Sequence, residues 1–134
     1  MQEPSVPFSA LVVDDSPHIR MLLTKLLQRS GFTQIDIAVN GVEGLEHFQK
    51  TKADVVFLDA IMPEMDGLVV LREIKSLASK TVVVMTTSIS EKEKVLQFKE
   101  SGADYYLLKP FEDGKFIETL QKVITLLQQR HKEG

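Results

Sequence analysis

The sequence predicts a doubly wound α/β fold, in which helices cover both faces of a parallel β-sheet. Five short segments rich in β-branched and aromatic residues recur along the chain, and a helical pattern follows each of them. Each connection is long enough for a crossover, which parallel strands require. These two observations predict one sheet of five strands, accompanied by five helices.

The expected strands are apolar at most positions. Segments such as "DVVFL" and "TVVVMT" offer no polar face to water, which is typical of strands buried on both sides. The five segments cover residues 8–13, 33–39, 54–58, 81–86 and 104–108.

The first helix is expected directly after the first strand. Ser16 is a suitable N-cap, and Pro17 is favourable at the first helical position. Gly31 is expected to end this helix. Between them, apolar side chains repeat at helical spacing: Ile19, Leu22, Leu23, Leu26 and Leu27.

Local signals also mark the other helices. Asn40 with Glu43, and Ser90 with Glu93, have the spacing of a capping box, which predicts the starts of the second and fourth helices. The third helix is expected at about 65–78. The last helix carries an apolar stripe: Ile117, Leu120, Val123, Ile124 and Leu127.

Length and composition indicate a single domain over residues 1–134, with 1–7 as an N-terminal extension. The 16 basic and 19 acidic side chains leave a net charge of −3, which argues against direct nucleic-acid binding or a polybasic membrane patch. The chain has no cysteine, so disulfides and thiolate metal sites are excluded. No segment has the pattern of a signal peptide or a membrane span, so we expect a cytoplasmic protein without membrane insertion.

Polar residues stand at the carboxyl ends of four of the expected strands. In doubly wound folds, ligands bind at the carboxyl ends of the strands, where these residues would lie. Three neighbouring carboxylates would repel one another, and a hard cation such as Mg²⁺ together with an ammonium group would offset this repulsion. This edge is therefore predicted to bind a phosphoryl group. The residues are Asp14 and Asp15, Asp59, Thr86 and Thr87, and Lys109 with Pro110.

Some of these residues also have simpler explanations. Asp14 and Asp15 precede a helix, where an acid can cap free amides. Lys109 and Thr87 can be ordinary solvated residues at strand ends. Asp59 has the weakest such alternative, because a carboxylate that closes a very apolar strand is costly to desolvate unless something pairs with it.

These motifs resemble the receiver domain of two-component response regulators, of the CheY kind. Four motifs carry the resemblance, which spans nearly the whole chain. They are the acid pair that follows "LVV", the segment "DAIMPEMDG", the segment "TTS" and the segment "GADYYLLKPF". The interval between Thr87 and Lys109 is the family's usual one, which favours Thr87 over Thr86 as the matching hydroxyl. The resemblance also implies a strand order of 2-1-3-4-5, an order for which CheY is a known example.

The resemblance assigns a role to each carboxylate. Asp59 would be the phosphoacceptor, taking a phosphoryl group from a sensor histidine kinase or a phosphotransfer protein. Mg²⁺ or Mn²⁺ would be held by Asp14, Asp15 and Asp59, together with the backbone carbonyl of Ile61. The chain would assist its own phosphorylation and dephosphorylation without being an enzyme in the usual sense.

The resemblance further implies a switch. Lys109 and Thr87 would contact the phosphoryl oxygens. The peptide bond between Lys109 and Pro110 would be cis. When the Thr87 hydroxyl moves to the phosphoryl group, Tyr106 would favour an inward rotamer. The surface of the fourth helix, fifth strand and fifth helix would then bind a downstream protein target.

Two positions depart from common receivers. Ile61 and Ile89 replace residues that are often polar in relatives and that flank the path of the attacking water. Neither isoleucine can orient water by hydrogen bonding. We therefore expect both to shield the acyl phosphate and slow its hydrolysis.

The expected function is that of a stand-alone, CheY-type response regulator, as in chemotaxis, acting as a monomer or a weak phosphorylation-dependent dimer. Only the last helix and a short "RHKEG" tail fit after Phe111, so no output domain is expected in this chain. The alternative is a receiver domain from a longer regulator. A pseudo-receiver scaffold is less favoured, because every matched pocket position is filled.

Two other classes fit the sequence less well. A haloacid-dehalogenase-type phosphatase needs a second acid two residues after its nucleophile, where this chain has Ile61. It also needs a cap domain, for which a chain of this length has no room. A flavodoxin-like flavin binder needs a phosphate-binding loop after the first strand, where this chain has Asp14 and Asp15.

Overall fold

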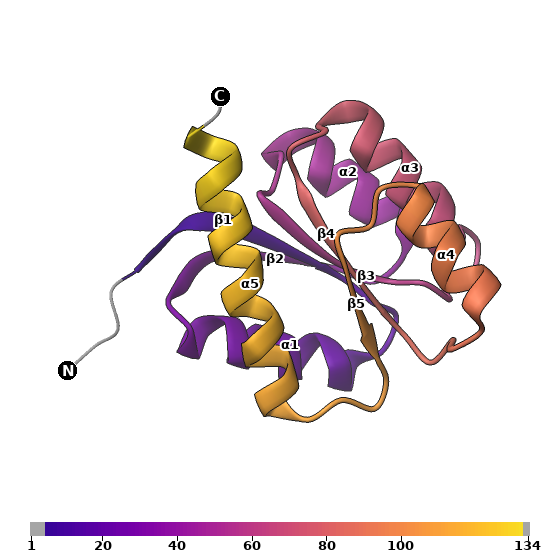
Figure 1. The fold of residues 1–134 in the computed structure, drawn as a ribbon, viewed down its shortest axis with the longest axis horizontal. Coiled ribbons are helices and arrows are strands. Elements are labelled where there is room, and N and C mark those ends of the chain that lie inside the picture. Colours follow the sequence, from indigo (N-terminus) through magenta and orange to yellow (C-terminus); the bar gives the residue numbers. More distant parts are fainter. Residues whose placement is uncertain (1–4, 133–134) are drawn as a thin grey trace.

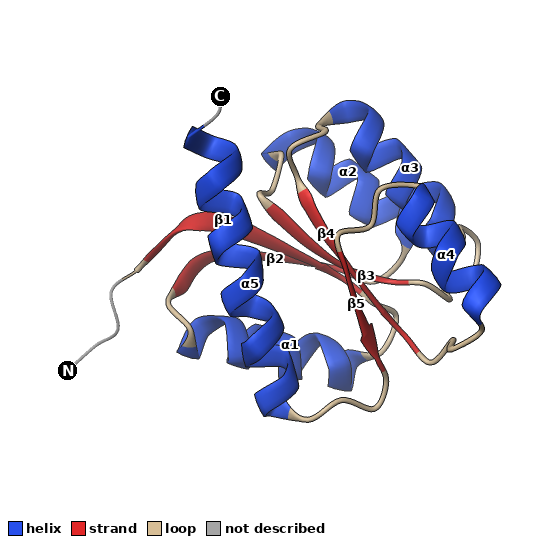
Figure 2. Ribbon diagram, in the orientation of Figure 1, coloured by secondary structure: helices blue, strands red, loops and turns tan. Residues whose placement is uncertain are grey.

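The computed structural model describes residues 5–132, in which strands and helices alternate (Figures 1 and 2). The strands are β1 (Val6–Val13), β2 (Phe32–Ala38), β3 (Val55–Asp59), β4 (Val82–Thr87) and β5 (Tyr105–Leu108). The helices are α1 (Pro17–Arg29), α2 (Gly41–Thr51), α3 (Gly67–Leu77), α4 (Lys92–Glu100) and α5 (Asp113–Lys132).

The five strands form one parallel sheet in the order β2-β1-β3-β4-β5, which confirms the predicted fold class and strand order. Helices α1 and α5 cover one face of the sheet, and α2, α3 and α4 cover the other (Figure 1). The strand order reverses at β1 and β3. The carboxyl ends of these two strands are therefore the place where doubly wound folds bind ligands.

Each strand sends alternate side chains to the two faces, and each face has its own apolar core. On the α1/α5 face, strands β1, β3, β4 and β5 contribute Val12, Phe57, Val84 and Leu107. On the α2/α3/α4 face, they contribute Leu11, Leu58, Val83 and Met85. This alternation decides which face each polar residue at the carboxyl edge approaches.

The burial of the strands follows their place in the sheet. Strands β3 and β4 are buried at every position, as their apolar sequences predict. Strand β2 lies at the edge of the sheet and exposes several side chains, including Asp36 and Ile37. Within residues 5–132, no helix combines the length and hydrophobicity needed to cross a membrane.

The predicted starts of α1 and α2 are confirmed. The Ser16 hydroxyl accepts a hydrogen bond from the Ile19 amide, and the Asn40 side chain accepts one from the Glu43 amide. Helix α1 ends at Arg29, and Gly31 follows with φ 99°, a conformation that favours glycine.

The predicted cap at Ser90 is wrong. Helix α4 begins at Lys92, and its N-cap, Glu91, makes no side-chain capping bond. The reason lies in the preceding loop, where the Ile89 amide donates to the Thr87 hydroxyl and the Ile89 carbonyl accepts from Tyr106. These two bonds, one within the loop and one to β5, hold the chain outside helical geometry until after Ser90.

Other boundaries also differ from the predictions. Helix α3 begins at Gly67, after the N-cap Asp66, because a turn joins the Met65 amide to the Pro63 carbonyl. Strand β1 begins at Val6 and so includes the end of the predicted extension 1–7, of which residues 1–4 lie outside the described part. Helix α5 continues through the predicted tail to Lys132.

Candidate functional site

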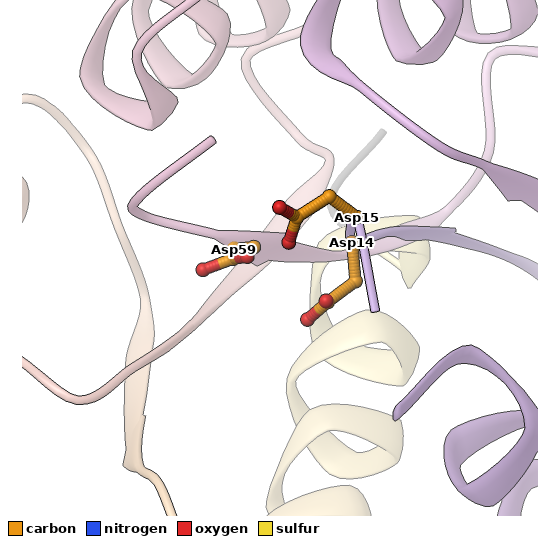
Figure 3. Close-up of side chains that lie close together, drawn as sticks. All are labelled: Asp14, Asp15 and Asp59. Carbon is orange, nitrogen blue, oxygen red and sulfur yellow. The ribbon is translucent and has the colours of Figure 1, made fainter. Parts of the chain in front are cut away.

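Three carboxylates meet at the carboxyl edge of the sheet. One oxygen from each of Asp14, Asp15 and Asp59 lies within 4.8 Å of the others (Figure 3). Asp14 and Asp59 are buried, with 0% and 4% of their surface exposed, whereas Asp15 is exposed. The cluster forms because β1 and β3 are neighbours, so residues far apart in the sequence end side by side.

Lys109 supplies the positive charge that the sequence predicted at this edge. Its ammonium nitrogen lies 2.8 Å from Asp14 Oδ2 and 3.6 Å from Asp59 Oδ1. The Lys109 amide donates to the Thr87 carbonyl, which continues the β4–β5 ladder to this residue, and the Lys109–Pro110 peptide bond is cis. The lysine is thus attached to the sheet at its base and paired with two acids at its tip.

The carboxyl group of Asp59 has an unusual pKa. Burial and the nearby charge of Asp14 raise this pKa from 3.8 to about 6, against the opposing effect of Lys109 and of the Ile61 amide, which donates to Asp59 Oδ1. Burial and the Asp14 charge thus outweigh the ammonium group 3.6 Å away, so the charged form of Asp59 is disfavoured here. The cluster therefore favours an additional cation.

The loop after β1 is held by hydrogen bonds to Asp14. Its Oδ1 accepts from the Ser16 amide at 2.9 Å, and its backbone carbonyl accepts from the Arg20 guanidinium at 2.8 Å. The sequence reasoning missed Arg20. The available signal was its spacing: Arg20 lies one helical turn after Ser16, so its side chain returns to the start of α1.

The loop between β3 and α3 packs closely against the end of β3. A Cβ atom on Gly67 would lie 2.6 Å from the Asp59 carbonyl oxygen and 2.7 Å from the Ala60 Cα, so a larger residue would force the backbone to shift. The Gly67 amide also donates to the Ala60 carbonyl. The glycine of the "DAIMPEMDG" motif thus fixes the loop that carries Ile61 beside Asp59.

Thr87, Ile89 and Tyr106 form a connected unit on the α4 side of the sheet. The buried Thr87 hydroxyl accepts from the Ile89 amide at 3.1 Å, and the Tyr106 hydroxyl donates to the Ile89 carbonyl. The Tyr106 ring packs against Phe98 of α4, with 6.2 Å between ring centroids. Burial raises the pKa of the Tyr106 hydroxyl, so it stays protonated as a donor.

Ile61 and Ile89 lie beside a common cavity of about 340 Å³ between the β3–α3 loop and α4. Ile61 is 56% exposed, and Ile89 packs partly into the core near Tyr106. Both side chains are therefore close to the Asp59 loop, but Ile61 lies at the rim. The remaining lining residues are Ala60, Met62, Asp66, Leu68, Lys94, Gln97 and Phe98.

The structure thus brings together the predicted residues in two groups. By strand alternation, Asp14, Asp59 and Lys109 approach the α1/α5 face, whereas Thr87 and Tyr106 approach the α2/α3/α4 face. The two groups meet at the carboxyl ends of β3 and β4, which are hydrogen-bonded neighbours.

Comparison with known proteins gives a consistent result. The family model described as response regulator receiver domain matches residues 10–121. The chain is 31% identical over 114 residues to the chemotaxis protein CheY of Bacillus subtilis, covering 85% of this chain and 95% of that protein. It is 36% identical over 115 residues to CheY of Halobacterium salinarum, covering 86% and 95%.

A solved structure shares the same fold. The chain matches the CheX-CheY-BeF3-Mg²⁺ complex from Borrelia burgdorferi with a TM-score of 0.83 and 30% identity, over 88% of this chain and 90% of that chain. The sequence motifs, the strand order and these similarities agree. The chain therefore belongs to the response regulator receiver domain family.

Proposed function

We propose that this chain is a phosphorylation-dependent switch of the CheY type, in which Asp59 accepts a phosphoryl group from a sensor histidine kinase or a phosphotransfer protein. The observation that carries the proposal is the cluster of Asp14, Asp15 and Asp59 oxygens within 4.8 Å, with the Lys109 ammonium beside two of them. Such a site combines a nucleophile with the charges that phosphoryl transfer needs.

In the proposed transfer, an Asp59 carboxylate oxygen attacks the phosphorus of a phosphohistidine. The new O–P bond forms as the P–N bond breaks, and the imidazole nitrogen keeps the electron pair. Phosphoryl transfer depends mainly on positioning and on neutralising the phosphoryl oxygens. Lys109, 3.6 Å from Asp59, and Thr87, at the end of the next strand, are the residues proposed for that task.

The acidic cluster fits a divalent cation, Mg²⁺ or Mn²⁺. Its ligand atoms are hard carboxylate oxygens from three acids, and a cation would offset the burial and the Asp14 repulsion that raise the pKa of Asp59. The side chains of Asp14, Asp15 and Asp59 and the backbone carbonyl of Ile61 would hold the cation. When bound, it would neutralise the carboxylates and the incoming phosphoryl oxygens.

The output would begin at Thr87. Phosphorylation adds negative charge beside this hydroxyl, which accepts from the Ile89 amide in the described state. If the hydroxyl turned to donate to the phosphoryl group, the loop at Ile89 and its bond to Tyr106 would rearrange. The α4–β5–α5 surface would then change its affinity for a downstream protein.

Several related expectations stay predictions. These are a stand-alone role in chemotaxis, a cytoplasmic location, a monomeric or weakly dimeric state, and slow hydrolysis owing to Ile61 and Ile89. The alternative prediction is a place within a longer regulator.

Intact mass spectrometry after incubation with acetyl phosphate tests the phosphoacceptor. The wild-type protein should gain one phosphoryl group in the presence of Mg²⁺ and little in EDTA, and Asp59→Asn should gain none. Asp36→Asn is a matched control, because Asp36 is exposed on the edge strand β2. Phosphate incorporation in the Asp59→Asn variant would overturn the assignment.

A further inference from the structure

Thr86 has a buried hydroxyl that none of the proposed roles uses. It is 0% exposed, and among the described residues 5–132 no hydrogen-bond partner reaches its Oγ1. A buried hydroxyl without a partner costs free energy, which a valine of the same shape would avoid. The hydroxyl therefore points to a state of the protein in which a partner is present.

The position of Thr86 identifies the neighbouring chemistry. Strand alternation places its side chain on the α1/α5 face with Val82 and Val84, whereas Thr87 faces the opposite side. Thr86 is in register with Asp59 on β3, and adjacent strands lie about 4.8 Å apart. The hydroxyl is thus on the same face as Asp59, one strand away.

The sheet order places Thr86 between the base of Lys109 and the acids that its ammonium group reaches. The base of the lysine continues β5, and its ammonium reaches Asp59 on β3 and Asp14 after β1. Strand β4 lies between β5 and β3, and Thr86 is the last residue of β4 on this face. To reach from β5 to β3, the lysine therefore spans the end of β4 on the face that carries Thr86.

The ammonium group has a donor to spare. It has three N–H bonds, of which one is used well by Asp14 at 2.8 Å, while Asp59 at 3.6 Å is beyond good hydrogen-bond distance. A cation held by the acids would compete with Lys109 for Asp14. A phosphoryl group on Asp59 would attract the ammonium toward β3 and β4.

We propose that Thr86 is a positioning residue for Lys109. Its hydroxyl accepts a hydrogen bond from the ammonium once a phosphoryl group or its mimic occupies Asp59, and this bond holds the lysine against the phosphoryl oxygens. In the free protein the hydroxyl stays unpaired. The inference rests on the proposed function, since it concerns the phosphorylated state of Asp59.

The test measures binding of beryllofluoride, a noncovalent phosphoryl mimic, to the full chain in Mg²⁺ by ¹⁹F NMR. Thr86→Val, which lacks the hydroxyl, should bind about fivefold more weakly, the value of one typical hydrogen bond. Thr86→Ser, which keeps the hydroxyl, should bind within about twofold of the wild type. Thr119→Val is a matched control, because this buried threonine on α5 donates to the Lys115 carbonyl away from the site.

Thermal unfolding without Mg²⁺ separates positioning from simple packing. Thr86→Val should unfold at the same or a higher temperature than the wild type, because the unpaired hydroxyl is gone. Unchanged beryllofluoride affinity in Thr86→Val, equal weakening in Thr86→Val and Thr86→Ser, or a lower unfolding temperature of Thr86→Val would each overturn the inference. Failure of the wild type itself to bind beryllofluoride would instead overturn the proposed function.

Discussion

Replacing Asp59 by Asn is expected to stabilise the metal-free protein at neutral pH. Burial and Asp14 raise the pKa of the Asp59 carboxyl from 3.8 to about 6. A group whose pKa is higher in the folded state favours folding below its unfolded pKa, and this advantage is lost as the pH rises through the folded pKa. Above pH 6, the charged Asp59 therefore weakens the fold, and asparagine removes that charge while it can still accept from the Ile61 amide.

The size of the effect follows from the two pKa values. The difference between 3.8 and about 6 corresponds to about 3 kcal/mol at pH 7. Burying an amide also has a cost, so we expect a net gain of about 2 kcal/mol. For a chain of 134 residues, this gain raises the unfolding midpoint by about 7 °C.

Thermal unfolding followed by circular dichroism between pH 4 and 8, in EDTA and in Mg²⁺, measures this gain. In EDTA, the difference between Asp59→Asn and wild type should be small near pH 4 and largest above pH 6. Mg²⁺ should reduce it, because the wild type gains more from the cation. Asp36→Asn, at an exposed position on β2, should show no such pH dependence.

The opposite pattern would refute the reasoning. The quantity to compare is the difference in unfolding midpoint between Asp59→Asn and wild type. If this difference were no larger at pH 7 than at pH 4, the buried carboxylate would not be a source of instability. An equal gain in Asp36→Asn would point to net charge instead of the site.

Three further outcomes are expected. Thr87→Ala should still be labelled by acetyl phosphate, but NMR shifts around Tyr106 on labelling should be lost; unchanged shifts would exclude the coupling. Replacing Ile61 by Asn and Ile89 by Glu should speed loss of the phosphoryl group about tenfold, or about 1.4 kcal/mol of barrier, as followed by phosphate release after donor removal; equal half-lives would exclude shielding. Asp104→Ala should lower the free energy of unfolding in urea by about 3 kcal/mol, because Asp104 pairs with the partly buried Lys75 ammonium and Arg130 guanidinium, which would lose their acid. A loss below about 1 kcal/mol would show that water replaces the carboxylate.

The sequence by itself determined the features that depend on nearby residues. Apolar segments predicted the buried strands β3 and β4, and the Ser16 and Asn40 caps fixed two helix starts. Asp59 was recognisable because a carboxylate at the end of an apolar strand needs a partner. These signals are local, since each is read within a few positions of the chain.

The residues alone predicted that Asp14, Asp15 and Asp59 share one edge of the sheet, and the family resemblance added the strand order, which makes β1 and β3 direct neighbours. Periodicity alone predicts that the carboxyl ends of parallel strands share an edge, but not which strands are neighbours. That adjacency decides which acids repel one another and which cations reach them. The resemblance therefore supplied information that hydrophobic patterns do not contain.

Tertiary structure alone decided the finer features of the site. The loop bonds of Ile89 moved the start of α4 past Ser90, and Arg20 folded back onto the Asp14 carbonyl. The raised pKa of Asp59 and the unpaired hydroxyl of Thr86 also appear only in the folded chain. Burial, charge and hydrogen bonding at each of these atoms depend on residues distant in sequence, which only the packing of strands and loops brings within a few ångströms.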